Sequence, residues 1–263
     1  MPRFAANLTM LFTEFPFLDR FERAARAGFK GVEFLFPYAY PPEDIRARLD
    51  RFGLQLVLHN LPAGGWDAGE RGIACHPDRG AEFREGVERA IDYAGTLGVS
   101  QLNCLVGKTP GDVPAARVHE TLVDNLHHAS QRLKQAGIKL LIEPINRFDI
   151  PGFHLHRTDQ ALALIDEIGG GNLFLQYDVY HAQRTEGELA ETLRRHLPRI
   201  AHVQVADNPG RHEPGTGEIR FEFLFAELER LGYDGWIGCE YRPAGRTEAG
   251  LDWLPAGALA PRA

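Results

Sequence analysis

The feature that most constrains the fold is a regular alternation of short apolar runs with amphipathic helical patterns along all 263 residues. Each apolar run has the length and composition of a strand that is buried on both faces. Eight such runs occur, at residues 4–8, 31–36, 54–58, 101–106, 138–143, 172–178, 200–206 and 235–240. Helical patterns lie between them, over residues 17–27, 42–52, 81–97, 114–136, 158–168, 187–196 and 221–231. Thr158 or Asp159 is expected to cap the fifth helix, and a short helix is expected after Thr247.

One strand and one helix recur about every 30 residues, which is typical of a closed (β/α)8 barrel. We therefore predict an α/β fold with a single TIM-barrel domain over residues 1–263, in which residues 254–263 form a loose tail. The alternative is an open, doubly wound sheet. It is disfavoured because no glycine-rich dinucleotide turn follows the first strand, and because polar groups follow many strands instead of gathering at one switch point.

Several of the predicted strands end at a group that can bind a metal or transfer a proton. The run Leu140-Leu141-Ile142 stops at Glu143, and later runs stop at Asp178, Gln204 and Glu240. A carboxylate at the end of a buried strand is costly to desolvate unless it meets a cation or hydrogen-bond donors. Because the carboxyl ends of barrel strands meet at one face, these four side chains are predicted to form one site.

Glu143, Asp178, Gln204 and Glu240 would make an all-oxygen ligand set, which suits Mg²⁺ or Mn²⁺. The sequence leaves open whether such a metal is required. Two carboxylates beside a metal can also move a proton between neighbouring carbon atoms of a substrate through an enediol, with Glu143 and Glu240 as the acid/base pair. The alternative is that each carboxylate separately pairs with an arginine or caps a helix.

The two roles of Glu143 compete, because a carboxylate that is tightly bound to a cation is a weaker base. Either the metal holds Glu143 loosely or Glu240 is the principal base.

Four further residues are candidates for binding a substrate. His59, Lys108 and His181 follow predicted strand ends, and Arg71 lies on a long loop from which it could hold a carboxylate bidentately. Each has an alternative role: Lys108 as a solvated side chain, His59 as a structural histidine, and Arg71 as a partner of Glu70 or water.

Composition excludes some classes of partner. The formal net charge of −7 and the pI near 5.9 argue against binding to nucleic acid or an anionic membrane. Cys75, Cys104 and Cys239 are widely spaced and form no metal-binding pattern, which suits a reducing compartment. With no signal peptide or long apolar run, we expect a cytoplasmic protein that acts on a small molecule. The sequence leaves open whether the protein forms a homo-oligomer.

Longer segments also resemble a known family. They include Val32-Glu33-Phe34-Leu35-Phe36-Pro37-Tyr38, His59-Asn60-Leu61-Pro62-Ala63-Gly64, Gly69-Glu70-Arg71-Gly72-Ile73-Ala74-Cys75, Ile142-Glu143-Pro144-Ile145-Asn146, His212-Glu213-Pro214-Gly215-Thr216-Gly217-Glu218-Ile219 and Trp236-Ile237-Gly238-Cys239-Glu240-Tyr241. On these segments the chain resembles the xylose isomerase-like barrel superfamily and, within it, the hydroxypyruvate isomerase family.

The resemblance implies interconversion of hydroxypyruvate, a small 2-oxo acid, and 2-hydroxy-3-oxopropanoate (tartronate semialdehyde). It also implies that Glu143 and Glu240 are the acid/base pair and that they surround a divalent metal with Asp178 and Gln204. The alternatives are a 2-oxotetronate isomerase, a related sugar-acid isomerase or epimerase, a non-catalytic sugar-acid binding barrel, and a metal-dependent hydrolase. The superfamily's 3-epimerases have a histidine where this chain has Gln204, and this difference weakens the hypothesis that the chain is an epimerase.

Overall fold

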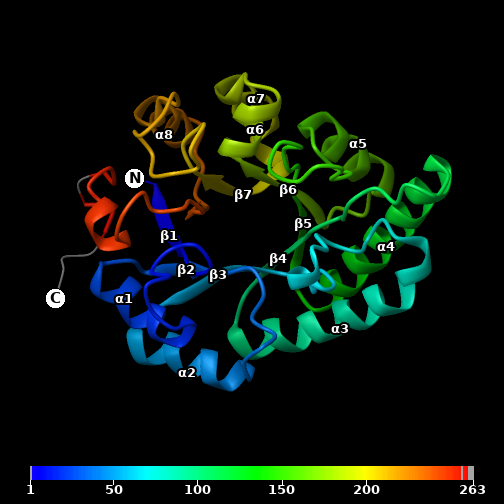
Figure 1. Cartoon of the computed structure of the whole chain (residues 1–263), viewed down its shortest axis with the longest axis horizontal. Helices are drawn as coiled ribbons and strands as arrows, with labels where there is room; N and C mark the ends of the chain where they lie inside the picture. The colour runs from blue at the N-terminus through cyan, green and yellow to red at the C-terminus, as the bar shows by residue number, and fades with distance from the viewer. Residues whose placement is uncertain (1, 256, 260–263) are drawn as a thin grey trace.

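The computed structural model describes residues 2–255 and 257–259 and contains a closed barrel of eight parallel strands, paired in chain order (Figure 1). The strands are β1 (Arg3–Asn7), β2 (Gly31–Glu33), β3 (Gln55–Asn60), β4 (Gln101–Cys104), β5 (Lys139–Ile142), β6 (Leu173–Asp178), β7 (Ile200–Val205) and β8 (Trp236–Cys239). The predicted (β/α)8 barrel is confirmed. The extent of the domain stays a prediction, and part of the predicted tail, residues 256 and 260–263, lies outside the described residues.

Helices connect the strands and lie outside the barrel (Figure 1). They are α1 (Arg20–Arg26), α2 (Pro42–Phe52), α3 (Gly80–Leu97), α4 (Ala115–Gln135), α5 (Thr158–Ile168), α6 (Val179–Thr185), α7 (Leu189–His196) and α8 (Phe221–Arg230). Short 3-10 turns supplement them: η1 (Phe17–Asp19), η2 (Trp66–Ala68), η3 (Pro77–Arg79), η4 (Leu197–Arg199) and η5 (Thr247–Gly250).

The structure corrects the predicted cap of α5. Thr158 is the first helical residue and Arg157 is the N-cap, so neither Thr158 nor Asp159 caps the helix. The side chain of Gln160 closes this turn, because its Oε1 atom accepts a hydrogen bond from the backbone N–H of Arg157 at 3.1 Å. The backbone N–H of Thr158 donates instead to Glu186, at 2.7 Å.

The predicted ends of several strands also move. Strand β5 ends at Ile142 and strand β8 ends at Cys239. Glu143 and Glu240 therefore follow their strands instead of belonging to them. The 3-10 turn η5 stands where a short helix was predicted after Thr247.

The interior of the barrel is unusually polar. Side chains two residues apart on a strand point the same way, and His202 and Gln204 on β7 are both buried with Glu33 of β2. Glu33 reaches across the barrel because β8 carries glycine at position 238. A Cβ atom at Gly238 would lie 2.4 Å from the carboxylate oxygens of Glu33.

The three cysteines are buried and free, in line with the prediction of reduced thiols. No helix of the described residues is long and apolar enough to cross a membrane.

Candidate active site

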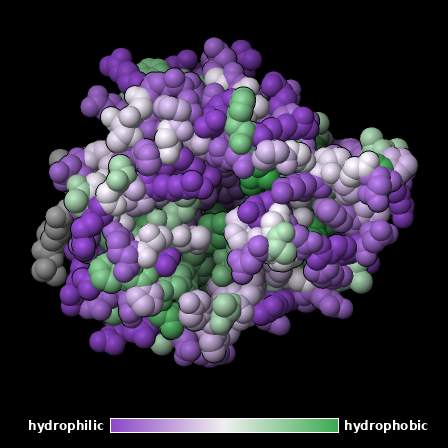
Figure 2. Space-filling view, in the orientation of Figure 1, coloured by the Kyte–Doolittle hydropathy of each residue, from purple (hydrophilic) through white to green (hydrophobic). Residues whose placement is uncertain are grey.

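A cavity of about 520 Å³ opens among the loops that follow the strands. It is lined by residues that include Arg71, Glu143, Gln176, His181, Arg211 and Glu240. Figure 2 shows that the face viewed is hollowed near its centre, with hydrophilic and hydrophobic residues both at the edge of the hollow. Side chains distant in the sequence therefore meet at the predicted place.

Glu143 is buried and has its two oxygens in different surroundings. Oε2 accepts hydrogen bonds from Nδ2 of Asn103 at 3.0 Å and from Nε2 of Gln176 at 2.9 Å. Oε1 accepts none from the described residues and lies 3.8 Å from Nε2 of His181. The amides thus fix one oxygen and leave the other free for chemistry.

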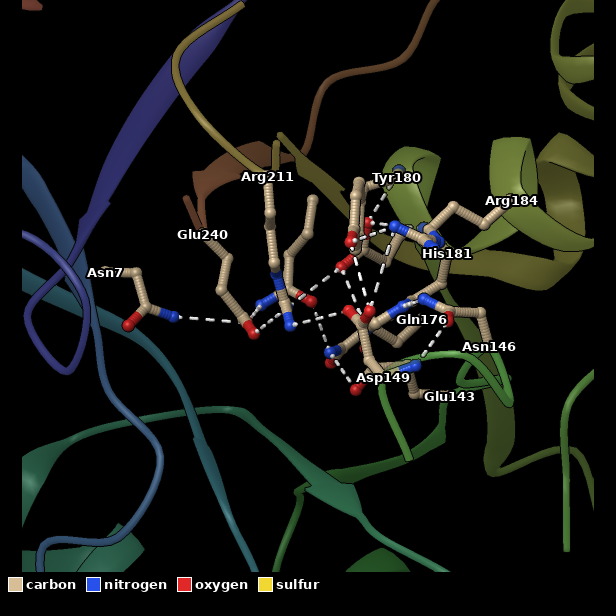
Figure 3. Close-up of polar contacts among 12 residues, drawn as sticks. Asn7, Glu143, Asn146, Asp149, Gln176, Tyr180, His181, Arg184, Arg211 and Glu240 are labelled. Atoms are coloured by element: carbon tan, nitrogen blue, oxygen red, sulfur yellow. Dashed lines mark hydrogen bonds and ion pairs between the residues drawn. The ribbon is translucent and has the colours of Figure 1, made fainter. Parts of the chain in front are cut away.

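Glu240 has a similar arrangement. Its Oε2 atom accepts hydrogen bonds from Nε2 of Gln204 at 2.5 Å and from Nδ2 of Asn7 at 3.2 Å. Its Oε1 atom accepts one from Nη2 of Arg211 at 2.8 Å (Figure 3). Each of the two glutamates is therefore held through Oε2 by two side-chain amides.

A chain of amides connects the two glutamates through the barrel. Gln176, besides binding Glu143, donates from Nε2 to Oε1 of Gln204 at 2.6 Å. Gln204 in turn donates to Glu240 and, at 2.8 Å, to Oε1 of Glu33. Nε2 of His202 lies 2.6 Å from the other oxygen of Glu33 and anchors the network in the barrel interior.

Asp178 ends β6 and caps α6. Its Oδ1 atom accepts hydrogen bonds from the backbone N–H groups of Tyr180 at 2.8 Å and His181 at 3.3 Å. Its Oδ2 atom is buried, has no hydrogen-bond partner among the described residues and lies 3.7 Å from Nε2 of His181. The cap directs the first turn of α6, and hence His181, toward Glu143.

Arg211 supplies positive charge to the carboxylates. Its guanidinium lies 2.8 Å from Glu240, 3.8 Å from Asp178 and 3.7 Å from Asp149. Asp207 holds the loop that carries it, accepting hydrogen bonds from the backbone N–H groups of residues 208, 215, 217 and 219. The alternative drawn from the sequence is that each carboxylate pairs with an arginine or caps a helix. The structure contains part of it, since Glu240 pairs with Arg211 and Asp178 caps α6.

The guanidinium of Arg211 carries one positive charge, whereas Glu143, Asp178 and Glu240 would together carry three negative charges if all were ionised. Burial, together with the charges of Glu240 and Asp178, raises the pKa of Glu143 well above its ordinary value. Burial also raises the pKa of Glu240 to about 8, although Arg211 acts in the opposite direction. The excess of negative charge is relieved when a carboxyl group takes up a proton or when a cation binds.

Donor atoms of Glu143, Asp178 and His181 all lie within 4.8 Å of one another, so these residues could hold a metal ion. The free Oε1 atom of Glu143 and the unpartnered Oδ2 atom of Asp178 fit a hard divalent cation. Gln204 was also predicted as a ligand. Its Oε1 atom accepts a hydrogen bond from Gln176, and its Nε2 atom donates to the carboxylates of Glu33 and Glu240.

Two predicted substrate-binding residues do not line the cavity, as far as the structure describes it. His59 is buried, its ring stacks on Phe34, and burial lowers its pKa to about 4. Lys108 donates from Nζ to the carbonyl of Gly69 at 3.1 Å. Arg71 does line the cavity, and it pairs with the backbone carbonyl of Glu70 instead of its carboxylate.

No role was assigned from the sequence to Asn7, Asn103, Gln176 or Arg211. Asn7, Asn103 and Gln176 are buried polar residues that each follow an apolar residue in a strand, and that pattern could have identified them. Arg211 has no such pattern, because a long loop brings it to the site.

The raised pKa values predict how stability depends on pH in the absence of divalent cations. Between about pH 5 and pH 8 the folded protein retains protons on Glu143 and Glu240 that the unfolded chain releases, so the free energy of unfolding should fall as pH rises. Glu240→Gln removes one of these protons and should make the fall smaller. Denaturant unfolding in EDTA across this range measures it.

Glu227→Gln is the matched control. Hydrogen bonds from Arg230 and Arg194 lower the pKa of Glu227 to about 2, so its loss should leave the slope between about pH 5 and pH 8 unchanged. Equal slopes for wild type and Glu240→Gln would contradict the raised pKa of Glu240.

Comparisons with known proteins agree with this geometry. Residues 21–256 match the family described as xylose isomerase-like TIM barrel. The chain is 57% identical to the hydroxypyruvate isomerase of Escherichia coli strain K12, over 97% of this chain and 98% of that one. It is 48% identical to the 2-oxo-tetronate isomerase of Cupriavidus necator, with the same coverage.

A solved structure is similar over nearly the whole length. The crystal structure of an AP endonuclease, family 2, from Brucella melitensis has a TM-score of 0.94 and 43% sequence identity, covering 96% of this chain and 98% of that one. The family match, the two isomerase relatives and the closed barrel agree, and the chain belongs to the xylose isomerase-like TIM-barrel family.

Proposed function

We propose that this chain is an isomerase that interconverts hydroxypyruvate and 2-hydroxy-3-oxopropanoate (tartronate semialdehyde). The observation that carries the proposal is the pair Glu143 and Glu240, each held through one oxygen by two amides beside the same cavity. The identity of 57% to a hydroxypyruvate isomerase supports this substrate.

The reaction needs two proton transfers at neighbouring carbons. Removal of a proton from C3 of hydroxypyruvate leaves its electron pair in a C2=C3 bond, while the C2 carbonyl oxygen takes up a proton. The resulting enediol loses the proton of the C3 hydroxyl to form the aldehyde, and the C2=C3 electrons bind a proton at C2. An acid and a base at fixed positions are therefore sufficient for the bond changes.

We assign the base to Glu240 and the acid to Glu143. A pKa of about 8 leaves about a tenth of Glu240 ionised at pH 7 and makes the ionised form a strong base for a carboxylate. Burial and two neighbouring carboxylates raise the pKa of Glu143 well above its ordinary value and so favour its protonated form. Glu240 also lies outside the cluster of donor atoms of Glu143, Asp178 and His181, which supports its assignment as the base.

Glu143 and Asp178 are the residues that would hold a divalent metal, for which Mg²⁺ or Mn²⁺ suits the oxygen donors. Glu143 would shift toward its ionised form beside a bound ion, so its role as acid applies to the site without metal. When bound, such an ion polarises the carbonyl and hydroxyl oxygens of the substrate and so acidifies the C–H bond.

Arg71 is proposed to bind the substrate carboxylate. Its guanidinium stacks 4.0 Å from the ring centre of Trp66, and its Nη1 donates to the carbonyls of Trp66 and Glu70 at 2.9 and 2.6 Å. These contacts hold the guanidinium rigid at the edge of the cavity, with further N–H groups available for a carboxylate. His181 is proposed to bind a substrate oxygen nearer the glutamates.

The second candidate is a 2-oxotetronate isomerase, which the relative at 48% identity favours. A cavity of about 520 Å³ has room for the longer substrate. A nucleic-acid substrate is disfavoured by the net charge of −7. We also propose that the protein acts in the cytoplasm, where its three free thiols stay reduced.

Turnover tests the proposal directly. Purified protein, with EDTA or with added Mg²⁺ or Mn²⁺, should convert hydroxypyruvate faster than the C4 acid 2-oxotetronate, as followed by ¹H NMR of the aldehyde product of the first and the 3-oxo product of the second. Glu240→Gln and Glu143→Gln should each lower kcat by about 10²- to 10⁴-fold, since each removes a proton-transfer group. Absence of turnover under all three conditions would overturn the substrate, and near-normal kcat in a variant would exclude that glutamate.

Arg71→Lys should raise KM for hydroxypyruvate by about tenfold with little change in kcat, because lysine cannot bind a carboxylate bidentately. Arg132→Lys is the control, since Arg132 lies on α4 and pairs with Glu88. An unchanged KM for Arg71→Lys would place the substrate carboxylate elsewhere.

A further inference from the structure

Asn146 is buried next to the site and its side chain can adopt only one orientation. Its Oδ1 atom accepts hydrogen bonds from the backbone N–H groups of Phe148 at 3.0 Å and Asp149 at 2.9 Å. Rotating the amide by half a turn would lose both hydrogen bonds and would place its NH₂ group next to the two backbone N–H groups, which are also donors. The Nδ2 atom of Asn146 therefore faces His181, 2.6 Å from Nδ1 of the ring (Figure 3).

This contact fixes the tautomer of His181. An amide nitrogen only donates hydrogen bonds, so Nδ1 of His181 must accept. A neutral imidazole has one acceptor and one donor nitrogen, which leaves the proton on Nε2. A protonated imidazolium would set a second N–H at Nδ1 against the NH₂ group of Asn146, so the contact also requires a neutral ring.

The surroundings of Nε2 favour the same tautomer independently. Nε2 lies 3.8 Å from Oε1 of Glu143 and 3.7 Å from Oδ2 of Asp178. A lone pair directed at the carboxylate oxygen of Asp178 would be repelled, whereas an N–H is attracted. Oδ2 of Asp178 is also the buried oxygen that has no hydrogen-bond partner among the described residues.

We propose that Asn146 is a positioning residue that holds His181 in the Nε2–H form, so that His181 donates a hydrogen bond to a substrate oxygen and is not a metal ligand. A metal ligand needs a lone pair at Nε2, which this tautomer lacks. Of the three residues whose donor atoms cluster, the carboxylates Glu143 and Asp178 remain as ligands. The substrate contact rests on the proposed function, whereas the tautomer does not.

Nuclear magnetic resonance of the full chain tests the tautomer without substrate. Long-range ¹H–¹⁵N spectra of protein labelled at histidine, with His181 assigned by its loss in His181→Gln, should show a protonated Nε2 and an unprotonated Nδ1, both in EDTA and with Mg²⁺. A protonated Nδ1, or loss of the Nε2 proton on adding Mg²⁺, would overturn the proposal.

Asn146→Asp tests the positioning role. A carboxylate facing Nδ1 accepts instead of donating, so the proton should move to Nδ1 and kcat should fall by about 100-fold or more, as expected for a catalytic imidazole in the wrong tautomer. Asn125→Asp is a matched control, because Asn125 is buried on α4 and donates to the carbonyl of Ala74. It should leave the His181 spectrum unchanged and kcat within about threefold.

An unchanged tautomer in Asn146→Asp, or a reversed tautomer with unchanged kcat, would overturn the positioning role. If Asn146→Asp does not fold, the wild-type spectrum still decides the tautomer. Failure of the wild type to convert hydroxypyruvate would instead count against the proposed function alone.

Discussion

The structure depends on keeping three carboxylates together in one buried pocket. Glu143, Asp178 and Glu240 are almost fully removed from solvent, and each would be costly to ionise there without partners. Arg211 supplies one positive charge, and burial together with the remaining excess of negative charge raises the pKa of both glutamates. The desolvation that makes these carboxylates costly to bury also raises their pKa, so that they can exchange protons nearer to neutral pH than exposed carboxylates can.

Neutral amides orient this charge without cancelling it. Amide N–H groups bind Oε2 of each glutamate, which leaves Oε1 of Glu143 free and Oε1 of Glu240 to Arg211, and Gln176 and Gln204 join the two glutamates. An arginine in place of an amide would lower the pKa of the carboxyl group that it holds, whereas an amide fixes its position with a smaller electrostatic effect. The barrel interior thus holds a polar network, with Glu33 and His202 at its base, where most barrels carry apolar layers.

Much of this could be predicted from the sequence. Strand periodicity gave the barrel, and the rule that strand ends converge brought Glu143, Asp178 and Glu240 together. The same rule failed for His59 and Lys108, because following a strand does not determine where a side chain points. The ring of His59 packs on Phe34, and Lys108 turns to the loop at Gly69. Arg211 could not be predicted, since its position depends on how Asp207 folds a twelve-residue loop, from 207 to 218.

The central claim is that protons move between carbon and Glu240. The most direct test is the reaction of hydroxypyruvate in D₂O, with deuterium on carbon followed by NMR. The account predicts that the wild type introduces deuterium at C3 of recovered hydroxypyruvate or at C2 of the product, and that Glu240→Gln does so far more slowly. Product that forms at the normal rate with no carbon-bound deuterium, as a direct hydride shift would give, would contradict it.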